Sequence, residues 1–218
     1  MAKREQKQIA NVLLEDSGRT YAREAGARVE RDTPAPLFQT LVVSLLLSAR
    51  ISAAIAVAAA KALFDQGWTT PRKMARSTWE RRAQILNEAG YARYDNRTAT
   101  MLGDTAELLL DRWDGDLRKL REEAGRDPDE VRKLLTEFSG IGEAGAAIFC
   151  REVQVAWDEL YPFADDKVLE EAGKLRLPTS PGGLADLAPK KDFPRLLAAI
   201  IRVALDNRQD EILARARG

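Results

Sequence analysis

The chain has 218 residues, of which 45% are hydrophobic, and its 34 basic residues balance its 34 acidic residues. This length suffices for one large domain or two small ones with hydrophobic cores. The sequence contains no histidine and one cysteine, Cys150. That composition excludes an internal disulfide, zinc sites built from Cys and His, cysteine-held iron–sulfur clusters and histidine-based catalytic triads.

The charge balance also bears on partners and location. Proteins that bind duplex DNA usually carry a basic excess, because neutralising phosphates supplies most non-specific affinity, so the zero net charge argues mildly against tight DNA binding. The N-terminal stretch "MAKREQKQIANVLLEDSG" is charged and lacks a long apolar core. We therefore expect no secretory signal and a cytoplasmic location.

The hydrophobic pattern is helical along the chain, and the alternation typical of strands is almost absent. In chain order, we expect helices over residues 5–14, 37–65 as one helix or a pair, from 71 onward, 77–90, 97–113, 127–138, 143–157 and 194–213. Asp127 and Pro128 suit the N-cap and first position of their helix, and Ser77 suits the N-cap of another. Residues 176–194, with four prolines, are expected to form a long connection. The sequence thus predicts an all-α fold.

The most hydrophobic stretch, residues 41–64, is long enough to span a bilayer. However, Arg50 lies at its middle and its second half is mostly alanine, which is weakly apolar. We therefore interpret it as buried core helix and expect no membrane partner.

The stretch "EFSGIGEAGAAIFC" (137–150) places Gly140 and Gly142 between two predicted helices. Glycines allow close approach to the backbone, and the second helix begins with unpaired N–H groups and a positive dipole end, where a phosphate oxygen would fit. The alternative is a tight helix–helix connection with a glycine cap, which is the commoner role of such turns.

Four segments in order resemble the endonuclease III superfamily of DNA glycosylases. "EFSGIGEAGAAIF" is similar to the hairpin of the family's helix-hairpin-helix motif, L-P-G-[VI]-G-x-[KY]-[TS]-A, and "LLSAR" (46–50) is similar to L-L-S-A-Q. "NEAGYARYDNRTATML" (87–102) resembles I-G-x-Y/L-x-x-K/R-A-x-x-I, and "PFADDKVLEEAGKLRLP" (162–178) resembles A-V-D-T-H-V-x-R-V-x-x-R-L. The resemblance covers about residues 37–178.

The resemblance implies two helical lobes flanking a cleft, here residues 31–156 with the hairpin and residues 1–30 plus 157–218 as the second lobe. In that family the hairpin amides hold a phosphate of duplex DNA, the target nucleotide is flipped out, and its glycosidic bond is cleaved. The implied DNA-binding residues are Gly140, Ile141, Gly142, Ala144, Gly145, Arg50 as gap filler and Tyr91 as wedge, with phosphate contacts from Arg93 and Arg97. The alternatives are an interface salt bridge for Arg50 and core packing for Tyr91.

The implied catalytic residue is Asp165, which would stabilise positive charge developing on the sugar. Asp165 or Asp166 also suits the N-cap of the following helix, and both roles are compatible.

The sequence departs from the family in several places. Ala144 stands where bifunctional members carry a nucleophilic lysine, which implies a monofunctional mechanism without strand cleavage. Lys167 is a possible substitute, although a solvated surface lysine is its commoner role. The cysteines of the family's iron–sulfur cluster are missing, so we expect neither cluster nor other cofactor. Ser44 stands nearest the glutamate of adenine glycosylases, which disfavours adenine excision.

Three functions follow from these observations. The first is a monofunctional DNA glycosylase that excises a damaged or mispaired base. The second is a catalytically inactive binding module of the same fold, which Ala144 and the acidic Glu143 in the hairpin favour. The third is a helical protein–protein adaptor, which the zero net charge favours.

Overall fold

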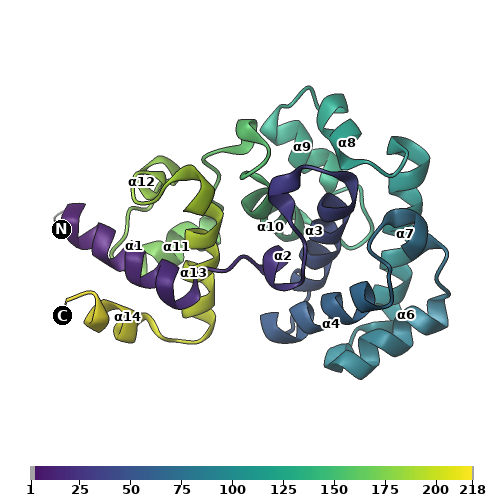
Figure 1. The fold of residues 1–218 in the computed structure, drawn as a ribbon, viewed down its shortest axis with the longest axis horizontal. Helices are drawn as coiled ribbons and strands as arrows, with labels where there is room; N and C mark the ends of the chain where they lie inside the picture. Colours follow the sequence, from purple (N-terminus) through teal and green to yellow (C-terminus); the bar gives the residue numbers. More distant parts are fainter. Residues whose placement is uncertain (1–2, 218) are drawn as a thin grey trace. The chain divides into compact units, whose positions relative to one another are not determined.

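The structure of the protein is a computed structural model that describes residues 3–217 (Figure 1). It consists of helices joined by turns, and this described part of the chain contains no β-strand. The all-α prediction is confirmed. The chain forms two compact units: unit 1 comprises the described residues of Met1–Thr20 and Leu160–Gly218, and unit 2 comprises Tyr21–Glu159.

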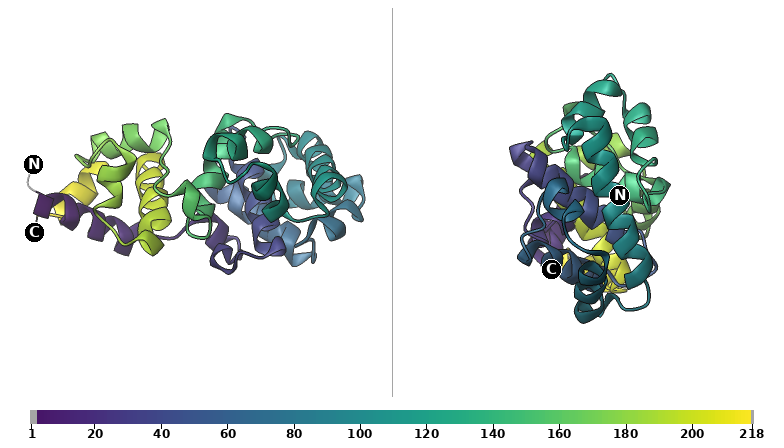
Figure 2. Two further views of the ribbon diagram at one scale, coloured as in Figure 1. Left: turned by 90° about the horizontal axis from the view of Figure 1, so that it is seen from above. Right: turned by 90° about the vertical axis from the view of Figure 1, so that its right-hand side faces the viewer.

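Unit 1 joins the two ends of the chain. Its helices are α1 (Lys3–Ser17), α11 (Asp166–Lys174), α12 (Pro181–Ala185), η4 (Lys190–Asp192), α13 (Phe193–Leu205) and α14 (Gln209–Arg215). The first and last segments of the chain, α1 and α13–α14, lie side by side within this unit (Figures 1 and 2). Ile9 and Leu13 of α1 pack into one core with Val168 of α11 and Leu196 of α13, and all four are buried.

Unit 2 contains the remaining helices. They are α2 (Tyr21–Glu24), η1 (Val29–Arg31), α3 (Pro34–Leu47), α4 (Ala53–Asp65), α5 (Pro71–Ala75), α6 (Trp79–Leu86), η2 (Asn87–Tyr91), α7 (Asp95–Trp113), α8 (Leu117–Glu123), α9 (Pro128–Leu135), α10 (Glu143–Val153) and η3 (Asp158–Leu160, which ends in unit 1). Residues 37–38 and 40–46 of α3 are all buried, because α4, α8 and α10 pack around it. The core of unit 2 is thus built around α3.

The hydrophobic stretch of residues 41–64 forms two helices, α3 and α4, separated by Ser48–Ser52. The Ser52 hydroxyl accepts the Ile55 N–H at 3.3 Å, which fixes the start of α4. Within residues 3–217, no helix combines the length and apolarity needed to cross a bilayer.

Two local predictions were wrong. Thr78, not Ser77, caps α6, since the Thr78 hydroxyl accepts the Arg81 N–H and the Ser77 hydroxyl instead donates to the Met74 carbonyl at 2.6 Å. The connection over 176–194 contains the short helix α12, whose N-cap Ser180 and first residue Pro181 repeat the usual start signals. The N-cap role of Asp127 is confirmed, because its carboxylate accepts the N–H groups of Asp129 and Glu130.

Cys150 lies on the buried face of α10 and has no exposed surface. Burial raises its pKa to about 12, because the thiolate would lose its hydration there. The thiol therefore stays protonated at neutral pH and serves as a small core side chain.

Arg82 of α6 is a buried cation held by neutral oxygens. Its side chain donates to the carbonyls of Ala99 at 2.8 Å and Ser77 at 2.6 Å, and it crosses α7 at Gly103, where a Cβ would lie 2.6 Å from Nη2. Burial lowers its pKa, and the charges of Glu107 and others partly offset that effect. Arg82 thus satisfies backbone acceptors that join α5, α6 and α7.

Replacement of Arg82 by methionine is expected to lower the free energy of unfolding by about 2–4 kcal/mol, because buried carbonyls would lose their donors. Arg81→Met is the matched control, since among residues 3–217 the exposed Arg81 side chain bonds only to Gln84 and Gln66. We expect that substitution to change the free energy of unfolding by no more than about 0.5 kcal/mol. Equilibrium urea unfolding measures both. Equal changes in the two variants would contradict the account.

Candidate nucleic-acid interface

Residues 136–142 form the turn between α9 and α10, and glycine at position 140 allows its backbone conformation. The Ile141 N–H donates to the Phe138 carbonyl at 3.0 Å, and Gly140 has φ of +82°. A positive φ at the third residue of a four-residue turn is the requirement of a type II turn, which glycine meets without strain. A Cβ on Gly140 would also lie 2.6 Å from the sulfur of Met101, so the position leaves no room for a side chain.

The turn is anchored to the core of unit 2 by side chains and by its carbonyls. Phe138 and Ile141 are buried, and the Phe138 ring lies 5.5 Å from that of Trp113. The carbonyl of Ser139 accepts the Thr105 hydroxyl at 3.2 Å, and that of Gly140 accepts the Ser48 hydroxyl at 3.3 Å. The turn is therefore fixed to α7 and to the end of α3.

The start of α10 has N–H groups without a capping side chain. Gly142 is the N-cap and carries no side chain, and in residues 3–217 no other side chain accepts from the N–H groups of Glu143 and Ala144. Gly142, Glu143 and Ala144 are all exposed, whereas Gly145 is buried against Ile141. Because the dipole of an 11-residue helix adds partial positive charge there, the exposed amides suit an oxygen of an anion.

Three arginines lie near this turn in sequence segments that pack around it. Arg50 lies two residues after Ser48 in the loop that follows α3, Arg93 lies in the turn between η2 and α7, and Arg97 lies in the first turn of α7. All three are exposed, and within the described residues none forms an ion pair with a carboxylate. The Arg93 guanidinium carbon lies 5.4 Å from the centre of the Tyr94 ring. These cations are thus free to meet an external anion.

The position of Tyr91 differs from the wedge role that the resemblance implied for it. Its side chain has no exposed surface, and its hydroxyl donates to the Leu46 carbonyl at 2.9 Å. Burial raises its pKa to about 12. Gly90, with φ of +86°, turns the chain within η2, and Tyr91 packs back into the core. A buried, bonded ring cannot act as a wedge in a base stack, and the core-packing alternative holds.

A pocket of about 220 Å³ opens between the turn, α3 and α7. Its walls include Ser48 and Ala49, Tyr94 and Arg97, and Gly140 of the turn. The pocket combines one unpaired cation with an aromatic ring and backbone, and it lies directly beside the anchored turn.

Asp165 is the N-cap of α11 in unit 1. Its Oδ1 accepts the Val168 N–H at 3.1 Å, and the residue is half-buried. Asp166 occupies the first helical position and is exposed. The capping role expected from the sequence is therefore present.

Lys167, the other amine considered, is engaged in ion pairs. Its Nζ lies 2.5 Å from the buried Glu171 and 3.9 Å from Glu170. These contacts hold the amine against α11 on its own helix, where Glu170 and Glu171 compete with any other partner.

Sequence reasoning missed the residues that hold the turn in place. Ser48 belongs to the "LLSAR" segment but was not assigned a contact, and Thr105 and Met101 stand within an ordinary amphipathic helix. Their contacts with Ser139 and Gly140 join residues 34 to 92 positions apart, which no local pattern reveals.

Comparison with known proteins identifies the fold. No protein-family model and no curated protein sequence matches this chain. Two solved structures do: a non-covalent endonuclease III–DNA complex with a TM-score of 0.56, and a trapped endonuclease III–DNA covalent intermediate, an estranged-adenine complex, with a TM-score of 0.55. In each case the identity is 19%, and the match covers 93% of this chain and 86% of the other. The chain therefore has the endonuclease III-like all-α fold.

Proposed function

We propose that this protein is a monofunctional DNA glycosylase that binds duplex DNA through the α9–α10 hairpin (Pro128–Val153). The observation that carries the proposal is the start of α10, where exposed N–H groups without a capping side chain follow a turn fixed by Ser48 and Thr105. An anchored set of amides binds an anion without a cost of ordering. The fold likeness supports DNA as that anion, since both similar structures are complexes with DNA.

The charges around the hairpin fit a modest affinity. Arg50, Arg93 and Arg97 supply cations for phosphates flanking the one that the amides hold. Glu143 opposes them, because an exposed acid at the first position of α10 repels phosphate. Binding should therefore weaken steeply as salt is added, and Glu143→Gln should strengthen it.

The chemistry assigned to Asp165 is stabilisation of a sugar cation. As the glycosidic bond breaks, its electron pair leaves with the base, and C1′ becomes electron-poor. A carboxylate beside C1′ stabilises that charge and orients the water that adds there. As the C1′–O bond forms, the water loses a proton, which passes to the departing base, and an abasic sugar in an intact strand remains.

The proposed function is tested by incubating the protein with duplexes that each carry one lesion or mismatch, and by following base release alongside duplex binding over a salt series. Release from at least one duplex is expected, with affinity that falls as salt rises. Salt-independent binding would contradict the hairpin contact.

A catalytically inactive binding module is the second candidate, and Glu143 together with Ala144 favours it. It predicts salt-dependent duplex binding without release of any base in the same experiment. Absence of duplex binding at low salt would instead favour the adaptor function.

Sodium borohydride treatment is expected to give no covalent protein–DNA adduct. The methyl group of Ala144 cannot form the imine that borohydride reduces, and Lys167 is held by Glu170 and Glu171. Because residue 144 is exposed, Ala144→Lys has room for the longer side chain and is expected to produce an adduct. Denaturing gel electrophoresis detects it. An adduct in the unmodified protein that disappears in Lys167→Gln would contradict the monofunctional mechanism.

A further inference from the structure

A second anionic-ligand site is suggested by a recess on unit 2 that the hairpin does not use. It has a volume of about 290 Å³ and is lined by Gln66, Gly67, Trp68, Lys73, Arg76 and Ser77. These residues come from the turn after α4, from α5 and from the two positions that follow α5, so half of the lining belongs to the basic stretch "RKMARSTWERR" (72–82). Three residues of that stretch, Lys73, Arg76 and Ser77, line the recess.

The charge of the recess is positive and unbalanced at its walls. Lys73 and Arg76 are exposed, and in residues 3–217 neither pairs with a carboxylate. The Ser77 hydroxyl accepts from Nη1 of the buried Arg82 at 3.1 Å, which brings a third cation behind the wall. No acidic residue is among those that line the recess. An anion placed there would be attracted by Lys73 and Arg76, whose charges are not offset by an acidic residue of the wall.

The recess also has an aromatic wall. Trp68 is half-buried, in contrast to Trp113 and Trp157, which lie in the core. Aromatic side chains such as indole stack on nucleic-acid bases, and this stacking tolerates any base because each base has a π-face. The neighbouring Gln66 side chain accepts from Arg81 at 3.2 Å, which keeps that arginine at the edge of the recess.

We propose that this recess binds one nucleotide unit, with its phosphate between Lys73 and Arg76 and its base against Trp68. A nucleotide joins a planar ring to an anion, and those are the two groups that the wall and the cations accommodate. The nucleotide can belong to a single strand or be free, and the volume of about 290 Å³ suits one such unit. This site is separate from the α9–α10 hairpin and does not depend on base excision.

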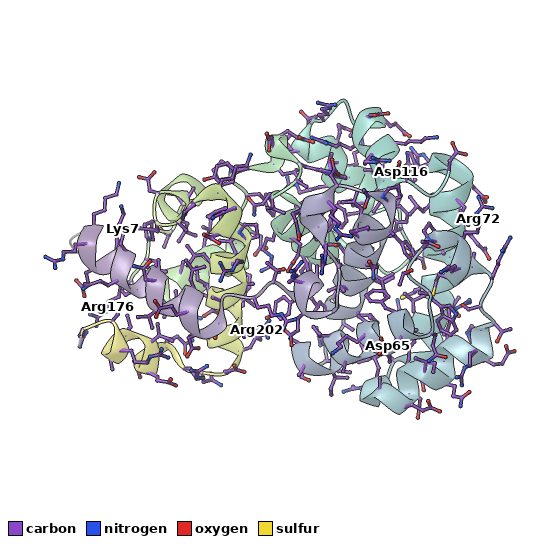
Figure 3. All side chains as sticks on the ribbon, in the orientation of Figure 1. Lys7, Asp65, Arg72, Asp116, Arg176 and Arg202 are labelled. Carbon is purple, nitrogen blue, oxygen red and sulfur yellow. The ribbon has the colours of Figure 1, made fainter. Side chains whose placement is uncertain are left out.

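The test uses the full chain and two probes, fluorescein-labelled octathymidylate followed by anisotropy and free thymidine monophosphate followed by tryptophan fluorescence. Lys73→Gln with Arg76→Gln, and separately Trp68→Leu, are each expected to weaken octathymidylate binding roughly tenfold. Arg72→Gln is the matched control, because Arg72 is exposed on the same helix (Figure 3) and does not line the recess. It should change affinity less than about twofold.

The outcomes separate this site from the hairpin. All measurements are repeated in Gly142→Asp, which blocks the hairpin amides, and strand binding at the recess should persist there even if the proposed glycosylase function fails. Binding of thymidine monophosphate would show that a free nucleotide suffices, and binding of octathymidylate alone would assign the site to a strand. If Arg72→Gln loses as much octathymidylate affinity as the other variants, the effect comes from the overall positive charge of this surface, and the proposal is overturned.

Two further outcomes concern the base. If octathymidylate affinity falls in the variant with Lys73→Gln and Arg76→Gln but not in Trp68→Leu, the recess binds phosphate only, and the nucleotide assignment is overturned. Trp68 is half-buried, so Trp68→Leu could also disturb local packing. Trp68→Phe is therefore measured as well, because it keeps an aromatic ring, and it should retain more affinity for octathymidylate than Trp68→Leu.

Discussion

Replacement of Asp165 by asparagine is expected to reduce base release about 100-fold or more while leaving the protein folded and able to bind duplex DNA. The amide is neutral and cannot stabilise a cation at C1′. It can, however, accept the Val168 N–H that the Asp165 carboxylate accepts at 3.1 Å, and Asn is about as good an N-cap as Asp. Single-turnover base release from the duplex identified as the best substrate measures the effect.

Two variants control for the cap and for local charge. Asp165→Ala should lose both release and about 1 kcal/mol of unfolding free energy, because alanine cannot cap α11. Asp166→Asn changes an exposed carboxylate one position later. The rate of base release by this variant should stay within about twofold of that of the unmodified protein. Undiminished release by Asp165→Asn would remove the assigned carboxylate from the mechanism.

Replacement of Gly142 by aspartate is expected to weaken duplex binding roughly tenfold or more, because an Asp N-cap would occupy the first-turn amides of α10 with its own carboxylate. The substitution is sterically free. Gly142 has φ of −94° and ψ of −169°, which any residue adopts, and a Cβ there meets nothing within 4 Å. The cap should also add a few tenths of a kcal/mol of stability, so that loss of affinity cannot be attributed to unfolding.

Gly142→Ala is the matched control, because it adds a methyl group without an acceptor and leaves the amides open. Its duplex affinity should remain close to that of the unmodified protein. The duplex affinity of Gly142→Asn should lie between those of Gly142→Ala and Gly142→Asp, because the Asn side chain accepts from the amides without adding a charge. Fluorescence anisotropy with a labelled duplex at low salt compares them. If the Gly142→Asp and Gly142→Ala variants bind the duplex equally well, the first-turn amides of α10 do not contact DNA.

The helical class of the fold was predictable because its signals are local. Asp127 caps the start of α9 and Pro128 occupies its first position. The hydrophobic stretch 41–64 forms α3, which is buried over residues 40–46, and α4, which is buried along one face. The error at Ser77 arose because Ser77 and Thr78 are both good caps, and their backbone conformation decides which one acts. The short α12 was hidden by prolines and glycines that usually mark connections.

The candidate site was only partly predictable. The turn glycines could be found, since a positive φ at Gly140 leaves a direct mark on the sequence. The burial of Tyr91 could not be decided, because a tyrosine after a helix-ending glycine can point either way, and the Leu46 carbonyl that fixes it lies 45 residues earlier. Likewise, nothing local distinguishes Lys73 and Arg76, which line a recess, from Arg82, which is buried between helices.

The most direct test of the hairpin contact is a two-dimensional amide NMR titration of the protein with a short duplex. We expect the amide protons of Glu143 and Ala144 to shift downfield on binding, as N–H groups that donate to phosphate do, and we expect these shifts to be lost in Gly142→Asp. Duplex binding that leaves both resonances in place while shifting others would contradict it.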